Sequence, residues 1–594
     1  MILPSAYSSP VAAIKPRLGR TTGRAGVRRG RFPVLRTPSL QRLVQGQDVT
    51  CKGDTRDRYK RLLAVCYVGS LNINEQMVTD GWAMAYRKYS KDYVRAETFA
   101  KSRREGMWRG TFEFNDCERL EMASKELWRL SATEAVAGLR KGEFCPSDLV
   151  EAAVTRIEAV DTEINALPIR CFERAFDQAR RIEATGQADE ESILAGLPIA
   201  VKDYNDVGGV QTTYGSPIYA DYVPERSDAT VARLEARGAI PLAKSNVPEW
   251  AGGHTFNPVN GLTRNPWNLD RSVGGSSGGS AAALASGQVW LATGNDLGGS
   301  LRTPAGFNGI VGLRPGPGVV PRGARLQAFD TLWVEGPMAR NVADIALMLD
   351  AGAGYAAEDP LSFDPTGSFV AALEADAPPA RIAFSPDLGV VPMALEVAEI
   401  ATAAADKLAA AGVDVTTDVP DFTGVLDGFQ TLRSVLLGTM MGELLQTRRS
   451  DIAEDIVGNV ERGFEVTPER LFEAERTRWN LYHRMTEFFE SHDLLICPSA
   501  SIPPFPVELR YVEEIDGQAC ETYIDWFAIT FALTMTSCPV ISLPCGFTAD
   551  GLPVGLQVVG PPRDEAGLLT AAKWMEALFG VAASLPINPR KPND

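Results

Sequence analysis

The sequence predicts an α/β fold for most of its 594 residues, with helices on the faces of a central sheet. The prediction rests on a rhythm of strand, helix and strand. Apolar strands are expected at residues 197–201 and 240–243. Between them, a helix begins at the cap residues Ser227 and Asp228 and ends at Gly238. Length alone predicts two or more domains. The first part of the chain does not follow the strand, helix and strand rhythm of the body.

Further elements follow in the same rhythm after a linker at residues 111–124. Ser131 and Glu134 form a capping-box pattern that opens a helix, and later helices are indicated by apolar residues at helical spacing. Strands are indicated by short apolar runs between turn residues. Helices are expected at residues 147–160, 280–285, within 340–395, at 394–411 and within 425–490, and strands at 289–293, 381–384 and 493–497.

Charge separates the start of the chain from its body. The first 47 residues contain one lysine, eight arginines and no acid, which leaves −25 on the remainder of a chain whose net charge is −16. An acidic body would repel phosphates, so general nucleic-acid binding by the body is not expected. Residues 1–46 lack a hydrophobic period and the apolar centre of a secretory signal, and we predict a disordered segment without a targeting role.

The stretch at residues 272–302, SVGGSSGGSAAALASGQVWLATGNDLGGSLR, concentrates glycine and serine. Two glycine-flanked serine sites, Ser276/Ser277 and Ser300, lie on either side of one apolar segment. Glycine beside serine removes Cβ atoms that would keep a substrate carbonyl away from the backbone, and it permits turns whose successive N–H groups point at one spot. A turn at residues 297–300 would therefore supply an oxyanion hole beside a nucleophilic hydroxyl.

A serine nucleophile needs a base, and histidine is scarce in this chain. There are three histidines, His254, His483 and His492. Upstream of the glycine-rich stretch, a predicted buried strand ends in Lys202. Burial disfavours the ammonium form, so such a lysine can lose its proton near neutral pH and act as a base. Serine and Lys202 form a workable catalytic pair.

Three segments, GLPIAVKDYND with Lys202, GGSSGGSAAA with Ser276 and GNDLGGSLRTPA with Ser300, resemble the amidase signature family of serine hydrolases in order and spacing. The tail segment SCPVISLPCGFTADGLPVGLQVVG fits as well, and the resemblance covers residues 125–594. It implies a mixed central sheet, Ser300 as nucleophile, Ser276 as a bridging serine on a cis peptide bond and Lys202 as base. It also implies an oxyanion hole made by the backbone N–H groups of Leu297, Gly298, Gly299 and Ser300.

By the same resemblance, Ser277, Asp296 and Arg302 support the site, and charge pairing also predicts that Asp296 and Arg302 brace the nucleophile loop. Asn295 and Leu297 depart from the family, which more often has serine before the aspartate and threonine after it. The implied reaction is hydrolysis of a carboxylic amide through an acyl-enzyme, without cofactor or metal. The expected partner is a small-molecule amide, and a homodimer is the oligomer that we consider.

Two apolar runs are candidates for the substrate channel. Helices from residues 425–490 often wall this channel in the family, although an apolar helical stripe is usually core. The run at residues 526–531 is expected to line the acyl pocket. The stripe consists of Leu426, Phe429, Leu432, Leu436, Leu437, Met440 and Met441.

A second resemblance precedes this body. Two strand-like runs, a helix capped by Asn72 with Glu75 three residues later, and a second helix at residues 92–105 are similar to the C-terminal half of staphylococcal-nuclease-like domains, an OB-type fold. The resemblance covers residues 47–118. Arg61 matches that family's remaining catalytic arginine, but the carboxylates that would hold calcium are missing. A partial accessory module without nuclease activity is expected.

The nine cysteines are dispersed, with no CxxC pair, so a zinc site is not expected. Cys51 and Cys66 lie on adjacent strand-like runs and would be able to pair in an exported protein. Two reduced, buried thiols in a cytoplasmic protein are the preferred interpretation. The sequence has no apolar run long enough to span a bilayer, and no membrane partner is expected.

Three alternatives stay open. Residues 274–278 fit the nucleophile elbow G-x-S-x-G of α/β-hydrolases and would imply a Ser276–Asp–His triad, but the preceding residues 265–271 are not expected to form the strand that an elbow needs. A glutamine-hydrolysing subunit of a tRNA-dependent amidotransferase would need partner subunits. A nucleic-acid-binding protein with an inactive hydrolase half would bind through the nuclease-like fragment and the basic segment. A stand-alone amidase is preferred because all three catalytic side chains are present.

Overall fold

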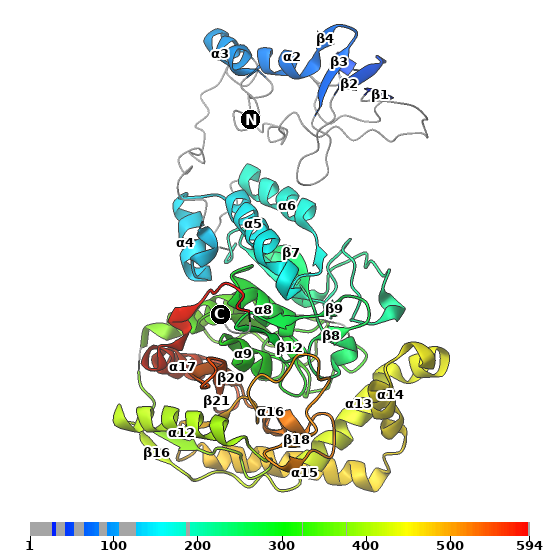
Figure 1. Cartoon of the computed structure of the whole chain (residues 1–594). Helices are drawn as coiled ribbons and strands as arrows, with labels where there is room; N and C mark the ends of the chain where they lie inside the picture. The colour runs from blue at the N-terminus through cyan, green and yellow to red at the C-terminus, as the bar shows by residue number, and fades with distance from the viewer. Residues whose placement is uncertain are drawn as a thin grey trace. The chain divides into compact units, whose positions relative to one another are not determined.

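The computed structural model describes residues 27–30, 42–44, 46–52, 64–81, 92–105, 126–185, 191–323, 325–375 and 377–591. The chain divides into two compact units, Met1–Cys117 and Glu118–Asp594 (Figure 1). Each unit has its own hydrophobic core. Within the described ranges, no helix has both the length and the apolar character needed to cross a membrane.

Among the residues that the structure describes, the N-terminal unit has a four-stranded antiparallel sheet and the helices α2 and α3. In sheet order the strands are β1 (Val27–Gly30), β2 (Val49–Lys52), β3 (Val65–Val68) and β4 (Leu71–Asn72), and the helices are α2 (Ile73–Thr79) and α3 (Val94–Arg103). The Asn72 side chain caps α2 by accepting from the N–H of Glu75, as the sequence predicts. β1 lies where no fold is predicted. Its pairing with β2 needs only backbone hydrogen bonds, which leave no hydrophobic period in the sequence.

Cys51 and Cys66 form a disulfide in this unit. They stand directly opposite each other in the antiparallel register of β2 and β3, so their side chains meet on one face of the sheet. The preference for two reduced thiols is therefore wrong, because register between strands cannot be read from cysteine spacing alone. Arg61 lies outside the described residues.

The larger unit is organised by an 11-stranded mixed sheet. Its order is β16, β15, β17, β21, β20, β13, β14, β12, β6, β7, β5. β6 is parallel to β7 and to β12, whereas β14 is antiparallel to β12 and β13. The strands are β5 (Ile169–Arg170), β6 (Pro198–Lys202), β7 (Ile240–Ser245), β12 (Leu291–Asp296), β13 (Val311–Arg314), β14 (Val334–Ala339), β15 (Arg381–Phe384), β16 (Asp414–Thr416), β17 (Leu494–Pro498), β20 (Val540–Phe547) and β21 (Pro553–Val559).

Helices cover this sheet, which confirms the predicted α/β class. Every residue of β6, β7, β12 and β21 is buried, and strands buried throughout need cover on both faces. The helices are α4 (Ala132–Lys141), α5 (Pro146–Ile164), α6 (Phe172–Thr185), α7 (Ala229–Ala236), α8 (Gly278–Ala285), α9 (Arg302–Asn308), α10 (Val342–Gly352), α11 (Phe369–Ala372), α12 (Leu395–Ala410), α13 (Val425–Arg448), α14 (Glu454–Phe464), α15 (Pro468–Phe488), α16 (Ala528–Thr534) and α17 (Glu565–Phe579).

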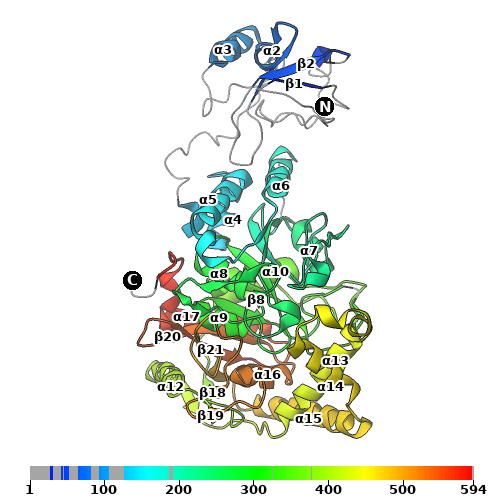
Figure 2. The same ribbon diagram turned by 45° about the vertical axis from the view of Figure 1, so that its right-hand side comes forward.

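Helices α13, α14 and α15 form a group of their own at one side of the larger unit, seen in yellow in both views (Figures 1 and 2). The short helix α16 packs against α13 of this group. The predicted helical region 425–490 is thus confirmed as three helices. Its apolar stripe faces two ways, toward the core and toward a cavity.

One expectation about the region before Ser276 is wrong. Residues 265–271 contain most of β11 (Asn268–Ser272), which pairs with β10 (Arg264–Asn265) in a two-stranded ribbon outside the central sheet. The ribbon sequence is polar, and such a hairpin is held by backbone pairing rather than by an alternating apolar face. The strand does not belong to the central sheet, so it does not supply the architecture of a nucleophile elbow.

Candidate active site

The site lies at one edge of the central sheet, where two neighbouring strands end. β6 and β12 are parallel and adjacent, with Leu291 opposite Ile199. Their carboxyl ends therefore lie at the same edge, and this brings Lys202, the last residue of β6, close to Asn295 near the end of β12. The backbone N–H of Lys202 donates to Thr293 Oγ1 at 2.9 Å, which ties the two strand ends together.

The Lys202 amine is fully buried and surrounded by oxygen atoms. Nζ lies 2.7 Å from each of Ser276 Oγ, Ser277 Oγ and Asn295 Oδ1. A neutral amine in this position has two hydrogens to donate and one lone pair to accept with. The geometry therefore suits donation to Ser277 and Asn295 and acceptance of a proton from Ser276.

Burial also changes the charge state of this lysine. It lowers the pKa of Lys202 to about 7, although the negative charges of Glu335 and Asp296 oppose the change. Glu335 stands opposite Asn295 in the pairing of β14 with β12 and is itself buried. Burial raises the pKa of the Glu335 carboxyl, while the nearby Arg325 guanidinium opposes that shift. Near neutral pH, Lys202 is thus able to serve as a base.

Ser276 and Ser277 stand immediately before α8. The peptide bond between Gly275 and Ser276 is cis, in agreement with what the resemblance implies. Gly275 also packs closely against the backbone of Gly253. A Cβ at position 275 would lie 2.3 Å from the carbonyl oxygen of Gly253, so only glycine fits there. The N–H of Ser277 donates to the carbonyl oxygen of Ser300 at 3.3 Å, so the two serine loops touch each other.

The loop after β12 is held by Asp296. Asp296 Oδ1 accepts from the N–H of Gly299 at 2.9 Å, and Oδ2 accepts from the N–H of Leu301 at 3.1 Å. Within the described ranges, the N–H groups of Leu297, Gly298 and Ser300 have no acceptor. Of the four N–H groups expected in the oxyanion hole, that of Gly299 is therefore already engaged with Asp296.

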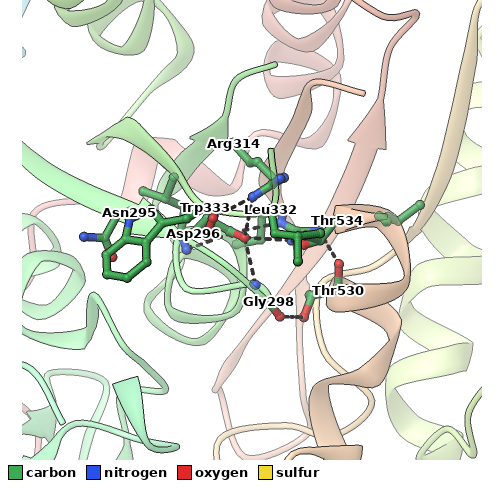
Figure 3. Close-up of polar contacts among 12 residues, drawn as sticks. Asn295, Asp296, Gly298, Arg314, Leu332, Trp333, Thr530 and Thr534 are labelled. Atoms are coloured by element: carbon green, nitrogen blue, oxygen red, sulfur yellow. Dashed lines mark hydrogen bonds and ion pairs between the residues drawn. The ribbon is translucent and has the colours of Figure 1, made fainter. Parts of the chain in front are cut away.

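Two buried arginines, Arg302 and Arg314, neutralise Asp296, and Figure 3 shows Arg314 beside the Asp296 carboxylate. Arg302 contacts both carboxylate oxygens at 3.0 Å, and Arg314 Nη1 lies 3.2 Å from Oδ1. Burial favours the protonated acid, but the two guanidinium groups outweigh it and hold the pKa of Asp296 well below its usual range. Arg302 also donates to the carbonyl oxygen of Thr530 in α16 at 2.7 Å. These contacts fit the expected bracing role of Asp296 and Arg302.

Ser276 and Ser300 border one cavity of about 100 Å³. Ser300 is half-buried at its surface. The walls combine aromatic rings, an apolar helix face and two arginines. They include Tyr204, Tyr214 and Trp250 on one side, Phe429, Leu437, Met440 and Met441 from α13, Phe527 before α16, and the arginines Arg325 and Arg433.

The two histidines downstream of Ser276, which a Ser276–Asp–His triad would need, are placed elsewhere. His483 packs against Trp479 in α15, and His492 is hydrogen-bonded to Thr416 at 3.0 Å. Neither borders the cavity, whereas Lys202 contacts Ser276 directly. The geometry therefore argues against a Ser276–Asp–His triad.

Several residues that sequence reasoning missed belong to this site. Asn295, noted only as a departure from the family, contacts the Lys202 amine, and its buried Nδ2 has no partner among the described residues. Glu335 is a single acid within an apolar strand, and no signal in the sequence ties it to Lys202. Arg433 carried a usable signal, because it interrupts the apolar stripe of α13 four residues from both Phe429 and Leu437.

Of the residues expected in the acyl pocket, Phe527 lines the cavity. Trp526 is buried and packs its ring against Phe505 and Phe307. Phe531 stacks on Phe429 with ring centroids 4.4 Å apart, which places it behind the wall. Of the three aromatic residues Trp526, Phe527 and Phe531, Phe527 is therefore the one that lines the cavity.

The mixed α/β sheet and the buried cluster of lysine and serine side chains point to a hydrolase without the nucleophile elbow of α/β-hydrolases, and comparisons with known proteins identify its family. The family model described as Amidase matches residues 148–569, and that of the staphylococcal nuclease homologues matches residues 36–110. The chain is 33% identical over 467 residues to an acylamidase of Rhodococcus erythropolis, across 77% of this chain and 97% of that protein. It is 34% identical over 479 residues to a glutamyl-tRNA(Gln) amidotransferase subunit of Moorella thermoacetica, across 76% and 97%.

Solved structures agree with these relatives. A bacterial aryl acylamidase of the amidase signature family matches with a TM-score of 0.71 at 26% identity, covering 77% of this chain and 99% of that one. A 6-aminohexanoate cyclic dimer hydrolase matches with a TM-score of 0.70 at 29% identity, covering 78% and 99%. The chain belongs to the amidase signature family and carries a staphylococcal-nuclease-like region near its N-terminus, which confirms both resemblances.

Proposed function

We propose that the chain is a stand-alone amidase that hydrolyses a carboxylic amide through an acyl-enzyme on Ser300. The observation that carries this proposal is the contact of the buried Lys202 amine with Ser276, at the border of a cavity that Ser300 shares. Family membership and the acylamidase relative support amide hydrolysis. The roles of individual residues are our proposal.

The proposed reaction has two halves. Ser300 Oγ attacks the amide carbonyl carbon, its proton passes to Ser276 Oγ, and Ser276 gives its own proton to neutral Lys202. The negative oxygen of the intermediate is stabilised by the N–H groups of Leu297, Gly298 and Ser300, which have no acceptor among the described residues. The relay then returns a proton to the nitrogen as the carbon–nitrogen bond breaks. Water repeats the sequence on the acyl-enzyme and releases the carboxylate.

Ser277 and Asn295 orient the base in this scheme. Each lies 2.7 Å from Lys202 Nζ, and together they accept the two hydrogens of the neutral amine. The lone pair of Nζ is then directed at Ser276, where the proton must be taken up. No step of this relay needs a metal or an organic cofactor.

A fluorophosphonate probe tests the proposal. We expect a single covalent adduct on Ser300 in the wild-type protein, no adduct in Ser300→Ala, and much slower labelling in Lys202→Ala. Peptide mapping of the adduct identifies the serine, and release of aniline from an acyl anilide measures turnover. Turnover by the Ser300→Ala variant would disprove the assignment.

Hydrolysis of glutamine within a tRNA-dependent amidotransferase complex is the second candidate. It is supported by the 34% identity to the amidotransferase subunit of Moorella thermoacetica. Glutaminase activity that appears only when partner subunits are added would favour it, and acyl anilide turnover by the isolated chain would favour the stand-alone amidase.

We propose a small-molecule amide as the partner of the site. We also propose a homodimer as the oligomeric state, which light scattering measures.

A cytoplasmic location, expected from the dispersed cysteines, stays a prediction. The Cys51–Cys66 disulfide weighs against it, because such bonds are rare in reducing compartments. Alkylation of free thiols in intact cells, followed by mass mapping, reports whether this pair is oxidised where the protein resides.

A further inference from the structure

The two arginines that line the active-site cavity differ in how their charge is balanced. Arg325 lies 3.4 Å from an oxygen of Asp228 and 3.5 Å from an oxygen of Glu335. Arg433 has no such partner, since no carboxylate oxygen of the described residues lies within 4.0 Å of its guanidinium nitrogens. A cation that is only 7% exposed is costly without a counter-charge. The cavity is where that counter-charge can come from.

Neutral side chains hold the Arg433 guanidinium in place. Nη1 donates to Asn459 Oδ1 at 2.9 Å and to Gln430 Oε1 at 3.4 Å, and Nη2 donates to the Tyr523 hydroxyl. Asn459 Nδ2 donates to the same hydroxyl at 2.7 Å. These contacts fix the orientation of the guanidinium group. A guanidinium has more N–H donors than these partners use, so donors remain for a ligand.

The position of Arg433 on α13 relates it to the reacting atoms. Phe429 lies one helical turn earlier, about 6 Å along the helix axis, and its ring borders the proposed oxyanion loop. A Cβ added at Gly298 would lie 3.2 Å from Phe429 Cζ. Leu437, one turn later, lines the cavity with apolar surface. Arg433 is thus a single fixed cation in an apolar wall close to the site of bond cleavage.

We propose that Arg433 is a carboxylate-binding subsite and that the preferred substrates are amides with an apolar body and a free carboxylate. This inference rests on the proposed amidase function. A carboxylate matches the planar donor geometry of a guanidinium and neutralises its charge. A neutral amide of the same shape would leave the Arg433 charge uncompensated in the cavity. Arg325 does not create this preference, because Asp228 and Glu335 already balance it.

Binding to a variant that cannot turn over tests the subsite separately from catalysis. The probes are the 4-nitroanilide of glutaric acid and the methyl ester of that compound, which share the acyl chain and the anilide and differ in the charge and the methyl group of the carboxyl. Calorimetry with Ser300→Ala measures the affinity of each. We expect the acid to bind about 10- to 100-fold more tightly than the ester, the range for a hydrogen bond to a charged group. In the double variant Ser300→Ala/Arg433→Gln, the ratio of the affinity for the acid to that for the ester is expected to fall to about one.

Two further variants sharpen the result. Arg433→Lys keeps the charge and is expected to retain part of the preference for the acid. Arg510→Gln is the matched control, because Arg510 pairs with Asp455 and does not line the cavity, and it should leave the ratio unchanged. Thermal unfolding verifies that each variant is folded.

The outcomes separate the subsite from the proposed function. Equal affinity for acid and ester in Ser300→Ala, an unchanged ratio in Arg433→Gln, or no binding of either compound at millimolar concentration would overturn the subsite. A failure of the proposed function is recognised independently, by the absence of a fluorophosphonate adduct on Ser300 in the wild-type protein.

Discussion

The protonation of one residue, Lys202, is expected to set the lower pH limit of activity. Burial lowers the pKa of Lys202 to about 7, and only the neutral amine can take the proton of Ser276. Below this pH the amine is charged and the relay stops, and above it the amine is neutral and the relay works. We therefore expect kcat/KM to rise as the pH increases through about 7. A pH profile with an acyl anilide measures this, and a flat profile between pH about 5 and 9 would contradict it.

The buried carboxylate of Glu335 is expected to influence the same pH limit. Its negative charge favours the ammonium form of Lys202 and so opposes the effect of burial. Glu335→Gln removes the charge and nearly keeps the shape, and the amide oxygen can still accept from one of the two N–H donors, Trp333 Nε1 or Asn205 Nδ2, that the carboxylate now binds. The acid limb of the kcat/KM profile is expected to move to lower pH, by up to about one unit.

The control for this substitution is Glu565→Gln. Glu565 is also buried and accepts from the N–H of Gly316 at 2.8 Å, but it is not among the charges that act on Lys202. Its replacement should leave the acid limb in place. A shift to higher pH in Glu335→Gln, or equal shifts in both variants, would show that Glu335 does not act through its charge on Lys202.

At the scale of elements, the turn from β12 into α9 depends on Gly299. Its φ of +122° is one that L side chains rarely adopt, and a Cβ there would lie 2.1 Å from Thr530 Oγ1 in α16. That hydroxyl also donates to the carbonyl oxygen of Gly298. Gly299→Ala is therefore expected to displace the proposed oxyanion loop and to slow fluorophosphonate labelling of Ser300 by about 100-fold or more, comparable to the loss of an oxyanion donor.

Gly209 supplies a control that separates backbone strain at a positive φ from a steric clash of the added Cβ. It has a φ of +75°, and a Cβ there would meet nothing within 4 Å. Gly209→Ala should lower the free energy of unfolding by about 1–2 kcal/mol through backbone strain alone and leave the labelling rate unchanged. If Gly299→Ala behaved in the same way, the contact with Thr530 would not matter for the loop.

The parts of the site that were predictable from sequence are those carried by contiguous motifs. Lys202, Ser276 and Ser300 each sit in a segment whose neighbours are glycines or a buried strand, so local chemistry and family resemblance both point to them. Glu335 and Arg433 are single charges within apolar segments. Their importance depends on which strand or helix packs beside them, and that is information about long-range contacts.

The same distinction applies to the fold of the whole molecule. The α/β class follows from strand and helix periods along the chain, and the comparisons confirm it. Strand β1, the ribbon strand β11 and the Cys51–Cys66 bond were missed, because each depends on backbone pairing between segments whose side chains carry no period. Pairing partners are chosen by the folded environment, so register is the least predictable part of this chain.

Two compact units with separate cores should also unfold separately. The Cys51–Cys66 bond closes a loop over a sequence separation of 15, and its loss is expected to destabilise the N-terminal unit by about 3 kcal/mol. In scanning calorimetry of the full chain, replacing both cysteines by serine should lower the midpoint temperature of one unfolding transition. A fluorophosphonate adduct on Ser300 should shift the midpoint temperature of the other transition and leave the first unchanged. If the cysteine variant lost amidase activity or shifted both transitions, the nuclease-like unit would have to be coupled to the active site.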